Sequence, residues 1–327
     1  MFNSKFRSLV FFTLCVMGFS GTVSAQADKS YPSKTVRLIV PFPPGQATDI
    51  IARLLADRFA QKWGQPVFVE NRGGGASIPG MTAGKDAAPD GYTITFASST
   101  TTAVNEALYP KLPYNMKRDF VPVGGVFTQP WLILANPAAP YSNLKELVDA
   151  AKQSPGKLTW GYGANALELA AELFKQRAQI DIKGVSYKGS GPAMNDLLGG
   201  HIMLAVDTMA SSLPHIQSGK LKAIASLSSE RAPQLPNVPT IAEQGYPGFV
   251  GVGWAGLFLP VSTPPAIVKK VSDDLQAIMK EPSMQQVLLQ RGSTPDLRSL
   301  PEWSAFVTAE TIKWADVIKK GNIQLAQ

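Results

Sequence analysis

The feature that most constrains the fold is a strand, helix and strand pattern that begins shortly after residue 30. Val36–Val40 and Val67–Asn71 are short runs of strand length. Between them, Ile50, Leu54 and Phe59 recur at helical spacing. Two strands joined by a helix form a βαβ unit, whose strands lie parallel in one sheet. The sequence therefore predicts an α/β fold.

The same alternation continues along the chain and predicts two lobes. Further strand-like runs include 121–127, 132–135 and 202–206. The chain crosses between two groups of elements near 127–129, and we expect it to return near 249–254. Two crossings without a flexible linker describe a hinge, which suits a cleft that closes on a ligand. The expected lobes are 28–127 with 251–327, and 128–250.

The first 25 residues are typical of a secretory signal peptide. Lys5 and Arg7 precede an apolar run at 9–19, and residues 23–25 give a small-x-small cleavage pattern. The apolar run is too short to cross a bilayer comfortably, which disfavours the alternative of an N-terminal membrane anchor. Cys15 lacks the small residues that precede a lipidated cysteine. We predict a signal peptide over 1–25 and a periplasmic location.

Composition narrows the possible functions. The single cysteine, Cys15, lies within the predicted signal peptide, so we expect a mature chain without disulfides or a thiol nucleophile. Two histidines, His201 and His215, offer little for metal binding or general-base chemistry. The net charge of +7 is spread along the chain, which indicates a solubilised surface more than a nucleic-acid footprint. We expect no metal, no cofactor and no nucleic-acid partner.

A proline-rich loop at 41–49 lies between the first strand and the first helix. In open α/β sheets, ligands bind beyond the carboxyl ends of the strands. The start of a helix offers unpaired backbone N–H groups that suit a carboxylate, and the prolines keep the loop stiff. On local pattern alone, a rigid connection without a ligand fits equally well. The candidate ligand-binding residues here are Phe42, Pro43, Pro44, Gly45, Gln46 and Thr48.

A second loop of the same layout, at 187–193, belongs to the other lobe. It again joins a strand to a helix through a glycine-containing turn. Other strands end in polar loops as well. Asp207, directly after an apolar strand, either accepts a hydrogen bond from a ligand hydroxyl or amine or caps residues 211–212. The candidates in these loops are Tyr187, Gly189, Ser190, Ala193, Ser98, Thr100, Tyr162, Asn165 and Asp207.

Ordered motifs at 41–45, 69–72, 187–189, 196–200 and 235–240 resemble those of the solute-binding receptors of tripartite tricarboxylate transporters, the Bug family. The resemblance covers nearly all of the chain after the predicted signal peptide. It implies a type II periplasmic-binding-protein fold, with two doubly wound lobes and a hinge. It also implies delivery of the ligand to a membrane transporter of one large and one small subunit.

Receptors of this family hold a ligand carboxylate between the two loops, partly through bridging waters. Asp207 matches the family's aspartate after a strand of the second lobe. Two departures stand out: Gln46 replaces a glycine, and the entry to the helix before 172–174 carries Glu168. An ionised Glu168 facing the cleft would oppose a second ligand carboxylate, whereas one facing solvent would not. The family roles carry over to Pro43, Pro44, Gly45, Thr48, Tyr187, Gly189, Ser190 and Ala193.

The sequence therefore predicts a binding protein and not an enzyme. The segment 188–191 resembles a nucleophile elbow only superficially, and His215 lies at a helix start. Two alternatives remain: a sensor that presents its ligand to a signalling receptor, and, less favoured, an exported α/β hydrolase. We expect a monomer that binds a small mono-, di- or aromatic carboxylate or an amino acid rather than a citrate-like triacid.

Overall fold

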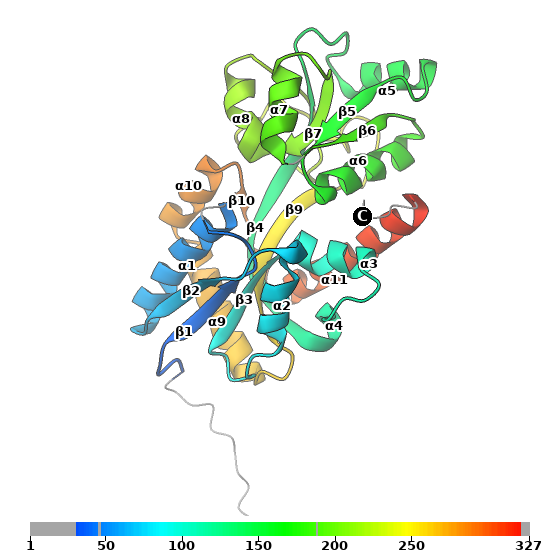
Figure 1. Ribbon diagram of the computed structural model, residues 1–327. Coiled ribbons are helices and arrows are strands. Elements are labelled where there is room, and N and C mark those ends of the chain that lie inside the picture. Colours follow the sequence, from blue (N-terminus) through cyan, green and yellow to red (C-terminus); the bar gives the residue numbers. More distant parts are fainter. Residues whose placement is uncertain (1–30, 45–46, 188, 322–327) are drawn as a thin grey trace, which may run out of the picture. The chain divides into compact units, whose positions relative to one another are not determined.

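The computed structural model describes residues 31–44, 47–187 and 189–321, whose strands form one mixed sheet (Figure 1). The strands are β1 (Val36–Val40), β2 (Val67–Asn71), β3 (Thr93–Ser98), β4 (Phe120–Ala135), β5 (Thr159–Tyr162), β6 (Lys183–Ser186), β7 (Leu204–Thr208), β8 (Lys222–Ser226), β9 (Val252–Pro260) and β10 (Thr294–Pro295). Their order is β2-β1-β3-β9-β4-β7-β5-β6, and β8 and β10 also pair with β4.

Helices follow most of the strands and cover the sheet (Figure 1). They are α1 (Ala47–Trp63), α2 (Ile78–Lys85), α3 (Asn105–Leu108), α4 (Met116–Asp119), α5 (Leu144–Gln153), α6 (Asn165–Ala178), α7 (Ser190–Leu198), α8 (Met209–Gln217), α9 (Pro265–Met279), α10 (Pro282–Gln290) and α11 (Leu300–Gly321), with short helical turns η1 (Gly75–Ser77) and η2 (Thr100–Val104). In the described part of the chain, no helix is long and apolar enough to cross a membrane.

The long strand β4 joins two halves of the sheet. One half-sheet contains β2, β1, β3 and β9, and the other contains β7, β5 and β6. Its first part, Phe120 to Pro130, pairs antiparallel with β9, and its last part, Trp131 to Ala135, pairs antiparallel with β7. In one half, β1 lies parallel to β2 and β3; in the other, β5 lies parallel to β6 and β7. The α/β fold and the parallel pairing predicted from the alternating pattern are confirmed.

The prediction of two separate strands at 121–127 and 132–135 was wrong, because β4 is continuous through both. Pro130 pairs with Val252 at the start of β9, where the ladder between β4 and β9 ends. From Trp131 onward, β4 pairs with β7 instead. A proline is tolerated at such a change of partner, since it lacks the N–H that the interior of a ladder requires.

Tryptophans dominate the core where β4, β9 and α11 meet. Trp254, Trp303 and Trp314 are buried. The rings of Trp254 and Trp303 pack edge to face with centroids 5.3 Å apart, and Trp314 lies 6.2 Å from Trp131 of β4. Large aromatic side chains bury the most apolar area, so these contacts fix α11 against the strand that joins the two half-sheets.

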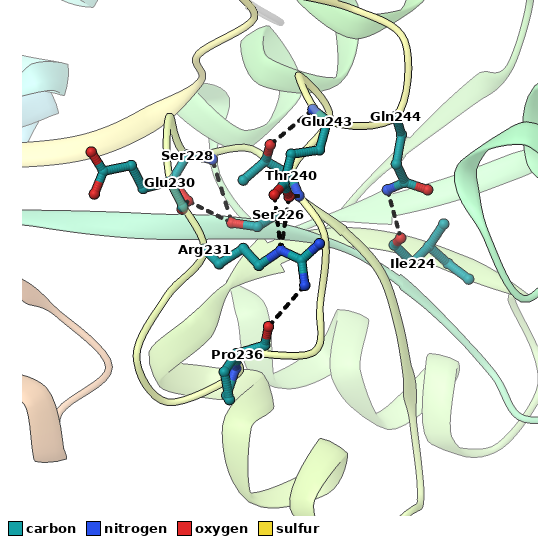
Figure 2. Close-up of polar contacts among 9 residues, drawn as sticks. All are labelled: Ile224, Ser226, Ser228, Glu230, Arg231, Pro236, Thr240, Glu243 and Gln244. Atoms are coloured by element: carbon teal, nitrogen blue, oxygen red, sulfur yellow. Dashed lines mark hydrogen bonds and ion pairs between the residues drawn. The ribbon is translucent and has the colours of Figure 1, made fainter.

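The chain returns from β8 to β9 through a long irregular segment, 227–251, which combines buried apolar residues such as Leu227, Ile241 and Phe249 with a set of polar contacts (Figure 2). Arg231 Nε lies 2.9 Å from Glu243 Oε2, and Arg231 also donates to the carbonyl of Pro236. The Thr240 backbone N–H donates to Glu243, and Gln244 Nε2 donates to a β8 carbonyl. An exposed ion pair contributes little by itself, so the hydrogen bonds to backbone groups define the turns of this segment more than the Arg231–Glu243 pair does.

Candidate functional site

The carboxyl ends of the two half-sheets face each other across the middle of β4. β3 ends at Ser98, which lies level with Ala255 of β9 and, through it, with Phe127 of β4. β7 runs the opposite way and ends at Thr208, level with Trp131. Along β4, the interval from Phe127 to Trp131 corresponds to about 13 Å at the usual rise of a strand. The loops that follow both sets of strands therefore converge on one region, the position at which α/β sheets bind ligands.

One of these loops leads from β1 to α1. Phe42 is half-buried, and Pro43 and Pro44 are exposed. Asn71, the last residue of β2, donates from Nδ2 to the Phe42 carbonyl oxygen at 3.1 Å. The same nitrogen donates to Oδ1 of Asp49, in the first turn of α1, at 2.8 Å. One side chain therefore bridges the two ends of the loop.

On the other half-sheet, the loop from β6 leads into α7. Gly189 has a φ of +109°, which residues with a Cβ rarely adopt. Ser190, the first residue of α7, donates from Oγ to Oδ1 of Asp207 at 2.6 Å. The turn after β5 packs against this loop, because a Cβ on Gly163 would lie 2.3 Å from the backbone nitrogen of Ser190. The loops after β5, β6 and β7 thus form one cluster.

Asp207 presents a buried, unsatisfied carboxylate oxygen in this cluster. The residue is 1% exposed, and its Oδ1 also accepts from the Thr208 backbone N–H at 2.6 Å. Oδ2 is buried and has no hydrogen-bond partner among the described residues, and the same holds for Oγ of Ser98. Burial raises the pKa of Asp207, and interactions with Ser190, the Thr208 backbone and the Ser211 side chain oppose that rise. An unsatisfied buried polar atom is costly, so these two atoms are candidates for a polar contact that forms only when a ligand binds.

Tyr162 and Glu168 form a pair at the end of β5. The Tyr162 hydroxyl donates to Oε1 of Glu168 at 3.0 Å. Burial raises the pKa of Tyr162, and the negative charge of Glu168 raises it further. A Cβ on Gly184 of β6 would lie 2.2 Å from the Tyr162 hydroxyl oxygen, so this side chain extends over β6. The Glu168 carboxylate therefore has a hydrogen-bond donor within the protein.

Comparisons with known proteins indicate one family. A family model described as the tripartite tricarboxylate transporter family receptor matches residues 51–323. Protein BugT of Bordetella pertussis is 36% identical over 315 residues, which cover 95% of this chain and 96% of BugT. The chain belongs to this receptor family.

Two solved structures similar to this receptor contain carboxylates. The R. palustris protein Rpa4515, solved with adipate, is 31% identical with a TM-score of 0.75 and covers 90% of this chain and 99% of its own. MatC from Rhodopseudomonas palustris, solved with bound malate, is 32% identical with a TM-score of 0.71 and covers 88% of this chain and 100% of its own. The predicted family and its periplasmic-binding-protein fold are confirmed.

The remaining candidate residues of the receptor differ in their exposure. Thr48 of α1 and Thr100 of η2 are half-buried, Asn165 opens α6 and is exposed, and Ala193 is buried in α7. Gly45 and Gln46 lie outside the described residues. The role of every candidate in ligand binding stays a prediction. Among the described residues, no group of three or more His, Cys, Asp or Glu side chains could hold a metal ion.

Two further residues support the site and were not singled out from the sequence. Asn71 holds both ends of the first loop, and Asp196 accepts from the Tyr187 hydroxyl at 2.8 Å. Both lie in motifs that carry the family resemblance, which was the available signal. Their roles depend on partners in other elements, so local pattern could not assign them.

Proposed function

We propose that this receptor captures a small carboxylate between the loops that lead into α1 and α7. The observation that carries this proposal is the opposition of the two sets of strand ends across β4. Each of the two loops ends in the start of a helix, where free N–H groups and the helix dipole favour an anion. The carboxylates in Rpa4515 and MatC support the same ligand class.

The contacts suggest a division of roles within the site. Pro43, Pro44 and Thr48 on one side, and Gly189 and Ser190 on the other, face the ligand carboxylate. The free oxygen of the aspartate at the end of β7 accepts from a hydroxyl or amine of the ligand. Tyr187 and Ala193 belong to the same carboxylate-binding set, as does Gly45, which like Gln46 lies outside the described residues. Phe42, Ser98, Thr100, Tyr162 and Asn165 complete the proposed site.

Glu168 sets the proposed limit on ligand charge. Glu168 lies in the first turn of α6, and its carboxylate accepts a hydrogen bond from the Tyr162 hydroxyl. A second ligand carboxylate brought near it would meet a like charge. This favours monocarboxylates, aromatic carboxylates and amino acids over triacids.

The proposed biological role is delivery of the ligand to a tripartite tricarboxylate-type membrane transporter, without chemical conversion. The proposal places the protein in the periplasm after removal of residues 1–25. It treats 28–127 with 251–327 and 128–250 as two lobes of a monomer that close about β4 and β9.

A thermal-shift screen tests this function directly. A ligand that binds only the folded state raises the Tm. We expect shifts with some members of a panel of aliphatic and aromatic mono- and dicarboxylates and amino acids, and unchanged ligand on recovery. Shifts with sugars or metal ions and none with any carboxylate would refute the proposal, and turnover of a ligand would restore the enzyme alternative.

A further inference from the structure

The Asn71 side chain uses its whole amide in hydrogen bonds around the first loop. Nδ2 donates to the Phe42 carbonyl oxygen and to Oδ1 of Asp49, at 3.1 and 2.8 Å. Oδ1 accepts from Nη2 of Arg53 at 2.9 Å. These partners fix the orientation of the amide, because the reversed amide would set its oxygen against a carbonyl and a carboxylate.

The two acceptors of Nδ2 stand at opposite ends of the loop. Phe42 follows β1 by two residues, whereas Asp49 lies in the first turn of α1. Asp49 is 2% exposed and also pairs with Arg53, with 3.0 Å between Nη2 and Oδ1. A buried carboxylate must keep its hydrogen-bonded partners, so Asp49 is a firm anchor for the amide.

The segment after β2 supports the same loop by close packing. A Cβ on Gly73 would lie 2.7 Å from the backbone nitrogen of Pro43, and a Cβ on Gly80 would lie 2.6 Å from Cβ of Pro41. Real Cβ contacts are not this short, so both approaches require glycine. The residues from 71 to 80 therefore buttress the loop on the side of β2 and α2.

We propose that Asn71 is a positioning residue of the carboxylate site, holding the first loop in its binding geometry without touching the ligand. The inference rests on the proposed function. Without this bridge, the ligand would have to order the loop on binding, and that ordering opposes binding. In this proposal the loop contacts only the carboxylate group of the ligand. The substitution of Asn71 should therefore weaken binding by the same factor for every carboxylate, whatever the rest of the ligand is.

The test is Asn71→Ala, with Asn136→Ala as a matched control. Asn136 is a buried asparagine directly after β4, and its Nδ2 donates to the Leu197 carbonyl oxygen at 2.7 Å. Calorimetric titration with each carboxylate that shifts the wild-type Tm should show Asn71→Ala weakened about tenfold, or about 1.4 kcal/mol, by a common factor. Asn136→Ala should lower the Tm and leave the affinities unchanged.

The outcomes separate this inference from the proposed function. Unchanged affinities in Asn71→Ala, losses that differ between carboxylates, or an equal loss in Asn136→Ala would overturn the positioning role. Ligand-free crystal structures add a second readout: residues 42–44 and 47–49 should be displaced in Asn71→Ala and in place in Asn136→Ala. If the wild type bound no carboxylate, the proposed function would fail. If the first loop were unmoved in the crystal structure of Asn71→Ala, the positioning role would be overturned as well.

Discussion

The Ser190 hydroxyl donates a 2.6 Å hydrogen bond to Oδ1 of Asp207 and thereby joins the start of α7 to the end of β7. The bond occupies one carboxylate oxygen and leaves Oδ2 buried, without a hydrogen-bond partner in the described part of the chain. Two loops of the proposed site are thus held together by a side chain that keeps one acceptor free. This arrangement makes the ionisation of Asp207 important for both stability and binding.

Asp207→Asn should change the pH dependence of stability. Burial raises the pKa of Asp207 above its ordinary value of 3.8, so the folded state holds this proton more tightly than the unfolded state. The wild type should therefore lose stability relative to the variant as pH rises from 3.8 through the folded-state pKa. Asparagine keeps an oxygen for Ser190 and Thr208. Ligand-free melts should show the variant with the higher Tm at neutral pH and no gain in acid; a difference independent of pH would contradict this reasoning.

Glu168→Gln should relax the proposed discrimination against a second carboxylate. Removing the charge in the first turn of α6 should improve dicarboxylate affinity relative to monocarboxylate affinity by roughly fivefold, or about 1 kcal/mol. Glu172→Gln is the matched control, since this residue pairs with Lys175 one turn farther along the helix. Titration calorimetry with an aliphatic mono- and dicarboxylate of equal length measures the ratio. The same ratio in wild type and Glu168→Gln would remove Glu168 from the site.

Gly73→Ala should disturb the first loop through packing alone. The new Cβ would lie 2.7 Å from the nitrogen of Pro43 and 2.9 Å from the carbonyl carbon of Phe42, and backbone atoms must shift to make room. We expect a stability loss of about 1–3 kcal/mol in urea unfolding, with weaker carboxylate binding. Gly251→Ala is the control, because its nearest atoms lie at 3.5 Å or more. Full affinity in Gly73→Ala would mean that the loop tolerates the displacement.

Glu310→Ala should be strongly destabilising. Glu310 is 5% exposed, and its Oε2 accepts from the indole N–H groups of Trp314 at 2.9 Å and Trp254 at 3.2 Å. It also pairs with Lys313, whose pKa burial lowers. Truncation would leave that lysine without its carboxylate, at a cost of about 3 kcal/mol in urea unfolding.

Asp316→Ala on the same helix provides the comparison for Glu310. Its pair with Lys320 is exposed on both sides. An exposed pair contributes about 1 kcal/mol or less, so this variant should unfold close to the wild type. Equal effects of the two substitutions would show that burial does not determine the strength of the Glu310 pair.

The fold was largely predictable from the sequence, whereas the location of the ligand site stays a prediction. The βαβ pattern predicted parallel strands, and the loops after them predicted where a ligand site would form. The exception in the sheet was β4, in which Pro130 separates two apolar runs that belong to one strand. Local pattern shows a proline, whereas the change of partner strand that makes it tolerable involves distant residues.

The hydrogen bonds that hold the loops of the proposed site in place were far less predictable from the sequence. Asn71 meets acceptors at Phe42 and Asp49, 29 and 22 residues away in the sequence. Tyr162 and Glu168 are close in sequence, yet their hydrogen bond depends on the space over Gly184 in a neighbouring strand. Such contacts carry no local periodicity.

The sequence by itself determined the alternation of strands and helices, because the periodic burial of apolar side chains is a local property of the chain. It also determined the composition of the two loops, in which proline and glycine restrict the backbone. Only the tertiary structure decided that β3 and β7 end facing each other along β4. It also decided that Asn71 bridges the two ends of the loop between β1 and α1. Strand register and close packing set those relationships, and both arise between residues that are distant in sequence.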